Sequence, residues 1–321
     1  MKASQRISRR AFLPAAAGLA AAACSTAKPR AKSAVAVLRA PSYSSDLLAT
    51  MKQGAALCRL DVRGKRVLLK PNLVEFDRQT CINTHPAILA AAWELFQGLG
   101  ASEVMIGEGP GHRRDTMFLA EAAGYRQAVS GFDRFFVDLN LDDVTPRPGF
   151  LNDSRIYLPN TVLAADLIVS LPKMKTHHWA GVTLSMKNYF GLVPGGVYGW
   201  PKNPLHYAGI PKSIVELNRI FRRNFAIVDG VVGMEGNGPI QGTPKTCGVI
   251  VMGSDLVAVD STCCRIMGVD PAQVEFLRLA TSGGADLGNL AELQIDQRGE
   301  TIAAVREPFH LIPEFAALRL A

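Results

Sequence analysis

The amino-acid sequence predicts an α/β fold, in which helices cover both faces of a largely parallel, mixed sheet. Apolar runs typical of strands alternate with helix-like stretches along the body of the chain. In addition, 321 residues of 48% hydrophobic composition can fill one large core or two smaller ones. We therefore expect one domain over residues 33–321, or two lobes around a cleft with a seam near residues 147–153.

The first half of the chain has a β-α-β rhythm. Strands are predicted at 34–38, 66–69, 103–106 and 135–139, and helices at about 46–57, 86–99 and 116–129. The helix over 86–99 repeats apolar residues on one face, with Thr84 as its expected cap and Gly100 as its stop.

The second half continues the alternation. Strands are predicted at 167–171, 225–228 and 248–252, and helices at about 212–221, 256–267 and 271–281. Asp255 is expected to cap the helix that begins at Leu256, and Cys263 lies on the apolar face of that helix, which indicates a core position. Asp260 lies inside the same helix, where a carboxylate needs solvent or a partner, and we expect it to pair with a lysine.

Residues 1–32 have the features of a twin-arginine export signal and a linker. The segment Ser8-Arg-Arg-Ala-Phe-Leu13 overlaps a thirteen-residue, mostly apolar run that ends at Ala23. A membrane span requires roughly 18 residues or more, so this run is too short for one. We expect recognition by the twin-arginine machinery and a periplasmic or cell-envelope location. Membrane contact is then limited to the signal peptide or to a lipid anchor at Cys24.

The leader also accounts for the basic balance of the chain. Residues 1–32 hold seven of the 35 basic residues and no acidic ones, which leaves 28 basic against 28 acidic residues beyond them. The net charge of +7 therefore lies in the leader, and the body is close to neutral. No nucleic-acid partner is expected, because its electrostatic footprint should lie on the folded domain.

The cysteine spacing argues against a metal cluster. Beyond Cys24, five cysteines remain, and none forms a Cys-x-x-Cys pattern. We therefore expect neither an iron–sulfur cluster nor structural zinc. One disulfide is compatible with export, but the spacing does not assign it.

The segment from Leu171 to Gly196 is the main candidate site. It follows the strand at 167–171, and ligands of open α/β sheets bind at the carboxyl ends of strands. Its cations can hold a polyanion, or they can supply a general base and metal ligands, and interleaved aromatic residues indicate a partly buried surface.

The Pro-Gly-Gly turn at 194–196 and the neighbouring 198–200 resemble a lid, and His206 is expected to be structural. The candidate catalytic residues are Lys175, His177 and Lys187, and the candidate ligand-binding residues are Lys173 and Asn188.

Three further loops follow predicted strands and add candidate residues. Lys70 and Asn72 offer an ammonium and an amide to an anion, or they belong to an ordinary turn. The glycine-rich loop 107–111 leads into His112 and Arg113, a catalytic and a ligand-binding candidate, but it matches neither the Walker nor the dinucleotide pattern. Asp229 and Glu235, with His177, are candidate ligands of a divalent cation, although glycine-rich turns also favour Asp for local hydrogen bonds.

Five motifs together resemble the family called domain of unknown function 362. The resemblance covers nearly the whole body, its motifs are specific in order and spacing, and the family name implies no reaction. Some relatives carry a ferredoxin-like cluster domain, which the cysteine pattern here does not support. The motifs are Lys70 to Asn72, Pro172 to His177, Lys187 to Gly191, Asp229 to Pro239 and Asp255 to Asp260.

A more distant resemblance is to the lactate racemase family, in which a lysine carries a nickel-pincer nucleotide. Gly111-His-Arg113 is similar to that family's early Gly-Thr-His-Arg loop, and His177 precedes Lys187 by ten residues, as in that family. The resemblance implies that Lys187 carries the cofactor and that His177 and His112 serve nickel binding or proton transfer. The chain departs from the family at 184–186, where a Gly-Gly is replaced, and at 83–86, where an arginine of the phosphate motif is missing.

Three functions remain open from the sequence. The first is an exported enzyme that acts on a small anionic or hydroxy-acid-like substrate at the Lys/His cluster, with or without a divalent metal. The second is a noncatalytic periplasmic protein that binds an anion or a cofactor. The third is a membrane-tethered accessory or electron-transfer protein, which the missing cluster ligands disfavour.

Overall fold

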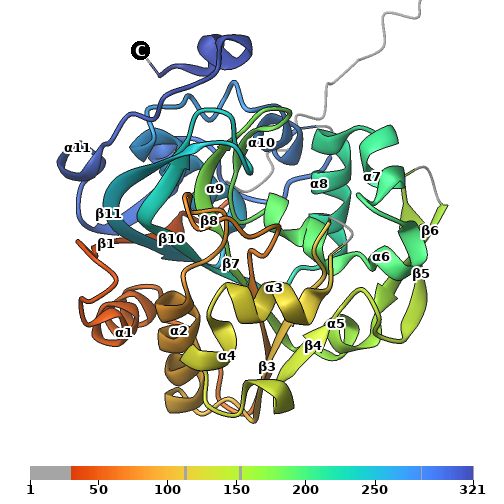
Figure 1. Cartoon of the computed structure of the whole chain (residues 1–321). Coiled ribbons are helices and arrows are strands. Elements are labelled where there is room, and N and C mark those ends of the chain that lie inside the picture. The colour runs from red at the N-terminus through yellow and green to blue at the C-terminus, as the bar shows by residue number, and fades with distance from the viewer. Residues whose placement is uncertain (1–29, 112–113, 152–153, 283, 321) are drawn as a thin grey trace, which may run out of the picture. The chain divides into compact units, whose positions relative to one another are not determined.

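A ten-stranded mixed sheet organises the protein, and its longest path has the order β12-β1-β11-β10-β7-β2-β3-β4 (Figure 1). The computed structural model describes residues 30–111, 114–151, 154–282 and 284–320. Neighbours from β10 to β4 are parallel, whereas β11 is antiparallel to both β10 and β1. The strands of this path are β1 (Ser33–Arg39), β2 (Arg66–Pro71), β3 (Glu103–Glu108), β4 (Phe136–Asp138), β7 (Leu167–Leu171), β10 (Asn224–Glu235), β11 (Thr243–Gly253) and β12 (Ile295–Gly299).

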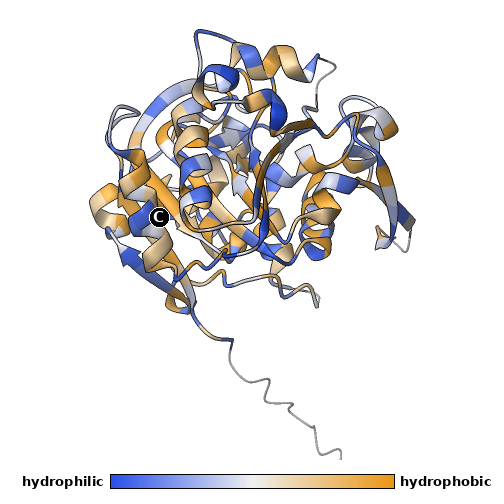
Figure 2. Ribbon diagram, turned by 90° about the horizontal axis from the view of Figure 1, so that it is seen from below, coloured by the Kyte–Doolittle hydropathy of each residue, from blue (hydrophilic) through white to orange (hydrophobic). Residues whose placement is uncertain are grey.

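Helices cover both faces of the sheet, and the predicted α/β class is confirmed. Successive strand residues enter opposite cores: Val67 and Leu69 of β2 lie in one apolar cluster and Leu68 in the other. Figure 2 shows mostly hydrophobic central strands and mixed outer helices. The first cluster is covered by α1 (Leu47–Leu57), α2 (Pro86–Gly98), α3 (Thr116–Ala122) and α4 (Tyr125–Ala128), and the second by α8 (Ile210–Ile220), α9 (Leu256–Ile266) and α10 (Glu275–Ala280).

Shorter elements decorate this framework. A hairpin of β5 (Val144–Phe150) and β6 (Ser154–Pro159) spans the predicted seam, of which residues 152–153 lie outside the described residues. Residues 31–321 nevertheless form one compact unit. The remaining elements are β8 (Lys173–His177), β9 (Gly181–Thr183), α5 (Asn160–Ala164), α6 (Gly195–Tyr198), α7 (Asn203–Tyr207), α11 (Ile302–Val305) and the 3-10 helices η1 (Phe132–Arg134), η2 (Lys187–Leu192), η3 (Glu292–Gln294) and η4 (Pro313–Leu318).

Several predicted local features differ in the structure. His85, not Thr84, caps α2, because its ring accepts the Ala87 N–H while the Thr84 hydroxyl donates to the Leu171 carbonyl. The predicted helix at 116–129 divides at Gly124, whose φ of 79° interrupts the helical backbone. The α10 helix begins at Glu275, after a turn.

Two expectations that concern α9 are confirmed. The Asp255 carboxylate accepts the Ala258 N–H and caps α9. Cys263 is fully buried in the core, and the five described cysteines are free. Within the described ranges, no helix is both long and apolar enough to cross a membrane. Residues 1–29 of the leader, Cys24 among them, lie outside the described residues.

Candidate functional site

A cavity of about 350 Å³ lies at the carboxyl ends of the parallel strands β2, β3 and β7. Lys70 of β2 and Glu108 at the end of β3 line it, as does Lys175 of β8, the short strand that follows β7. This is the edge at which the sequence predicted ligand binding. The predicted residues Asn72, His177, Lys187 and Asn188 also line the cavity.

A buried ion pair lies in the lining of the cavity. The Lys70 ammonium donates to the Glu108 carboxylate and to Asn188 Oδ1 at 3.0 Å, and both charged side chains are 1% exposed. Burial raises the pKa of Glu108 and lowers that of Lys70, while their mutual attraction opposes both shifts. Asn188 also donates to the Lys70 carbonyl, so this predicted ligand-binding residue holds Lys70 in position.

Two further buried lysines are held by backbone carbonyls. Lys175 donates to the carbonyls of Ile82 at 2.8 Å and Pro239 at 3.3 Å, and Lys202 to those of Gly109 and Phe190 at 2.5 and 2.9 Å. Burial lowers the pKa of Lys175 well below its usual range and that of Lys202 to about 7. Carbonyls carry no charge, so these two cations are not neutralised by their partners.

Lys187 differs from the other lysines of the cavity. Among the described residues, no hydrogen-bond acceptor and no carboxylate contacts its ammonium, which lies 4.9 Å from the centre of the Phe190 ring. Burial, together with the nearby charge of Lys70, lowers the pKa of Lys187 to about 8. Its ammonium is therefore available to a ligand in the cavity.

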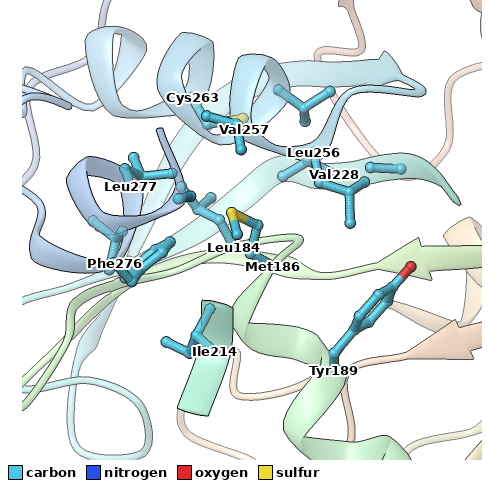
Figure 3. Packing of buried hydrophobic residues seen from close by; sticks show 14 of the residues in the cluster. Leu184, Met186, Tyr189, Ile214, Val228, Leu256, Val257, Cys263, Phe276 and Leu277 are labelled. Atoms are coloured by element: carbon cyan, nitrogen blue, oxygen red, sulfur yellow. The ribbon is translucent and has the colours of Figure 1, made fainter. Parts of the chain in front are cut away.

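The position of Lys187 is determined by the segment that precedes η2. The backbone N–H groups of Ser185 and Met186 donate to the buried Asp260 carboxylate of α9, at 2.8 and 3.0 Å. Burial raises the pKa of Asp260 to about 7. Leu184 and Met186 pack among residues of α8, α9 and α10 (Figure 3). Asp260 thus anchors the site segment. The predicted pairing of Asp260 with a lysine is wrong, because its partners in the described residues are Ser185 and Met186.

The hydrogen bonds of the histidines distinguish their roles. His177 Nδ1 accepts the N–H groups of Trp179 and Ala180 at 3.0 and 3.2 Å, so its proton is assigned to Nε2. His178 Nδ1 lies 2.7 Å from the Gly238 carbonyl and must donate, which leaves Nε2 with a free lone pair. His206, predicted to be structural, also lines the cavity, with Nδ1 3.3 Å from the Lys202 carbonyl. The basic nitrogens therefore belong to His178 and His206, and His177 offers a donor.

Two buried oxygens of the cavity wall lack partners. Asn72 Oδ1 and Thr183 Oγ1 have no hydrogen bond within the part of the chain that the structure describes. The two residues are 7% and 4% exposed and both line the cavity. Leaving a buried polar group unpaired costs about 1–3 kcal/mol, so a ligand or water in the cavity is their expected partner.

Lys173, Asp229 and Glu235 lie outside the lining of this cavity. Lys173 donates to the Asp229 carboxylate at 2.6 Å, and Tyr43 contacts both groups. Glu235 accepts the backbone N–H of His310. Both carboxylates belong to β10, which continues through the segment predicted to be a loop. The described residues contain no group of three or more His, Cys, Asp or Glu placed to hold a metal ion.

The cavity includes residues that were not predicted, and two predicted residues cannot be placed relative to it. His112 and Arg113 lie outside the described residues. Glu108, Thr183 and Lys202 line the cavity but were not predicted. The one indication for Glu108 in the sequence is its position at the end of a predicted strand. The segment predicted to be a lid is tied to Asn140, whose side chain and carbonyl accept the N–H groups of Gly195 and Gly196.

Comparison with known proteins places this chain among its relatives. A family model described as a domain of unknown function (DUF362) matches residues 67–265. The chain belongs to this family. The DUF362 protein is 31% identical, over 254 residues, to the thylakoid-associated protein sll1697 of Synechocystis sp. strain PCC 6803. The matched region covers 75% of this chain and 76% of the relative.

Among solved structures, the DUF362 protein resembles the lactate racemase apoprotein from Thermoanaerobacterium thermosaccharolyticum. The TM-score is 0.44 and the sequence identity is 12%. The similarity covers 74% of this chain but 58% of the racemase chain, less than two thirds of its length. The predicted family is thus confirmed, and the likeness to lactate racemase is weak.

Proposed function

We propose that this DUF362 protein binds a small carboxylate or phosphate in the cavity and is an exported enzyme acting on it. One observation carries the proposal: four lysines line the cavity, Glu108 is the single carboxylate among its described lining residues, and the Lys187 ammonium lacks a partner. An anion on Lys187 compensates charge that the protein itself leaves unpaired. Lys175 and Lys202, which no carboxylate neutralises within the described residues, add to the attractive potential in their protonated forms.

The histidines supply the chemistry that favours an enzyme over a static binding protein. His177 Nε2–H can donate to an oxygen on which negative charge develops, and the free Nε2 of His178 or His206 can accept a proton. The export leader and the thylakoid-associated relative support action at a membrane-bounded compartment of the cell envelope.

The nickel-nucleotide chemistry of lactate racemase does not fit His177 in this conformation. Two backbone N–H groups occupy Nδ1, so Nε2 carries the proton and has no lone pair for a metal. Lys187 has the side-chain nitrogen that covalent attachment would require in its neutral amine form, and the described residues offer that nitrogen no hydrogen-bond acceptor.

Titration calorimetry with acetate and methyl phosphate tests the proposal. We expect binding by the wild-type protein and at least a tenfold loss of affinity in Lys187→Gln. Such a loss corresponds to the binding free energy of about one charge-assisted hydrogen bond. Lys52→Gln, at an exposed position of α1, is the matched control and should bind as the wild type does. Absence of binding to either anion, or equal affinity of Lys187→Gln and wild type, would contradict the proposal.

A second measurement separates the enzyme from the noncatalytic binding protein. Small hydroxy acids are incubated with the protein in D2O, and the signal of the proton on the hydroxyl-bearing carbon is followed by NMR. Loss of that signal with wild type but not with His178→Gln or His206→Gln supports proton transfer. Binding without any chemical change in the substrates favours the static anion-binding alternative.

A further inference from the structure

The cavity changes in character from its floor to its mouth. Lys70, Lys175 and Lys202 are at most 1% exposed and form the floor. Among the thirteen lining residues that are half-buried or exposed, six have apolar side chains, five are polar and two are glycines. The six apolar residues form the apolar rim, which comprises Val74, Trp179, Phe190, Pro201, Pro239 and Ile240.

Aromatic rings dominate one side of this rim. Trp179 is 61% exposed and packs edge-on against His178 and His206, at centroid distances of 4.6 and 5.8 Å. Phe190 meets His206 edge-on at 5.9 Å. Because the Trp179 indole is largely exposed and lines the cavity, it offers a surface on which a planar group can stack.

The volume of the cavity also exceeds what a bare anion fills. A protein cavity of about 150 Å³ accommodates benzene. The 350 Å³ present here therefore has room for one ring and an anionic head group together. A simple phosphate or acetate on the lysines leaves the apolar rim in contact with water, so the rim would contribute no hydrophobic free energy to binding.

We infer that the ligand is an anion with a planar apolar body, whose carboxylate or phosphate lies on the lysine floor while its ring stacks against Trp179 and the apolar rim. This inference rests on the proposed function, because it assigns the head group to the same lysines. It adds a substrate class: aryl or comparable ring-bearing acids are preferred to their small alkyl counterparts. Asn72 and Thr183 supply hydrogen-bonding oxygens for polar substituents of the ligand.

The test compares two matched pairs of probes, phenyl with methyl phosphate and benzoate with acetate, by titration calorimetry. Burying one ring against the rim should make the aryl member of at least one pair bind about tenfold more tightly or better. In Trp179→Ala the ratio of aryl to alkyl affinity should fall towards one. Phe118→Ala removes an aromatic side chain that is also 61% exposed but lies on α3, outside the cavity lining, and should keep the ratio.

The outcomes separate this inference from the proposed function. Equal affinity for both members of each pair in the wild type overturns the inference and leaves anion binding in place. The same holds if Trp179→Ala keeps the wild-type ratio. Absence of binding by all four probes overturns both proposals.

Discussion

At the scale of single residues, the site depends on which buried charges have partners inside the protein. Glu108 neutralises Lys70, and backbone carbonyls hold Lys175 and Lys202. In the part of the chain that the structure describes, the Lys187 ammonium has no such partner and contacts the Phe190 ring. A partly buried cation without an anion is unfavourable, and burial accordingly lowers the pKa of Lys187 to about 8. The same imbalance makes Lys187 the lysine that is expected to respond most directly to an anionic ligand.

The affinity for a carboxylate should fall as the pH rises through about 8. The ammonium of Lys187 binds the anion, and above its pKa the free protein holds a neutral amine that must take up a proton first. The decline should approach about tenfold per pH unit, and binding should raise the pKa of Lys187. Calorimetric titrations with benzoate or acetate between pH 6.5 and 9.5 measure this decline in affinity. Both carboxylates stay ionised over the whole range, so the ligand itself does not titrate.

Lys187→Gln is the control for that pH dependence and should bind weakly with a flatter profile. Proton uptake is checked independently by repeating the titration at pH 8.5 in buffers of different ionisation enthalpy. An affinity that rises with pH, or the same slope in Lys187→Gln, would assign the titration to another group.

His177 should contribute to stability through Nδ1. In His177→Ala two backbone N–H groups lose their acceptor, and we expect a loss of about 2–4 kcal/mol in the free energy of unfolding. His177→Asn places a carbonyl oxygen near the position of Nδ1 and should lose about 1 kcal/mol or less. Urea denaturation measures both values. Equal losses in the two variants would show that Nδ1 is not the stabilising acceptor.

At the scale of elements, the site is assembled where η2 packs against the ends of β2 and β3. Gly191 of η2 allows this approach, because a Cβ at that position would overlap the Lys70 ammonium and the Glu108 carboxylate. On the other side, the Asp260 carboxylate of α9 binds the segment just before η2. The helix therefore holds Lys187 between a buried ion pair and a buried carboxylate.

Gly191→Ala should disrupt both the fold and anion binding. The added methyl group must displace the Lys70–Glu108 pair or shift η2, and we expect a loss of about 3 kcal/mol or more in the free energy of unfolding. Gly98→Ala, at the end of α2 with open space around it, is the matched control and should be neutral or slightly stabilising. Denaturation curves and acetate titrations compare the two variants, and wild-type behaviour of Gly191→Ala would contradict the packing argument.

At the scale of the whole molecule, both halves of the chain contribute interleaved strands to one sheet. β1 lies between β11 and β12, and β7 lies between β2 and β10. A boundary near residues 147–153 therefore cuts through shared hydrogen-bonded ladders, and the two halves cannot separate without breaking the sheet.

The two halves should consequently unfold together. Trp93 reports on the first half, and Trp179 and Trp200 report on the second. We expect the fluorescence transitions of Trp93→Phe and of the double variant Trp179→Phe/Trp200→Phe each to coincide with the loss of helical circular dichroism in the same protein. A fluorescence midpoint that differs from the circular dichroism midpoint of the same variant would indicate lobes that unfold separately.

Much of the fold follows from local sequence, because apolar periodicity and strand length are properties of short segments. The strands at 66–69 and 167–171 and the Asp255 cap were predicted from neighbouring residues alone. The extension of β10 through residues 229–235 was not predicted, because the glycines of this segment are typical of a turn. Pairing with β11 makes the segment a strand.

For the site, the sequence by itself determined the family, the lysines and histidines available, and their location at strand ends. The tertiary structure decided which of them share a cavity and which are already neutralised. Lys173 and Lys175 are two residues apart in one strand, yet Lys173 pairs with Asp229 while Lys175 faces the cavity. Residue type sets the charge a side chain can carry, but its pKa and its availability depend on burial and on partners brought together from distant parts of the chain.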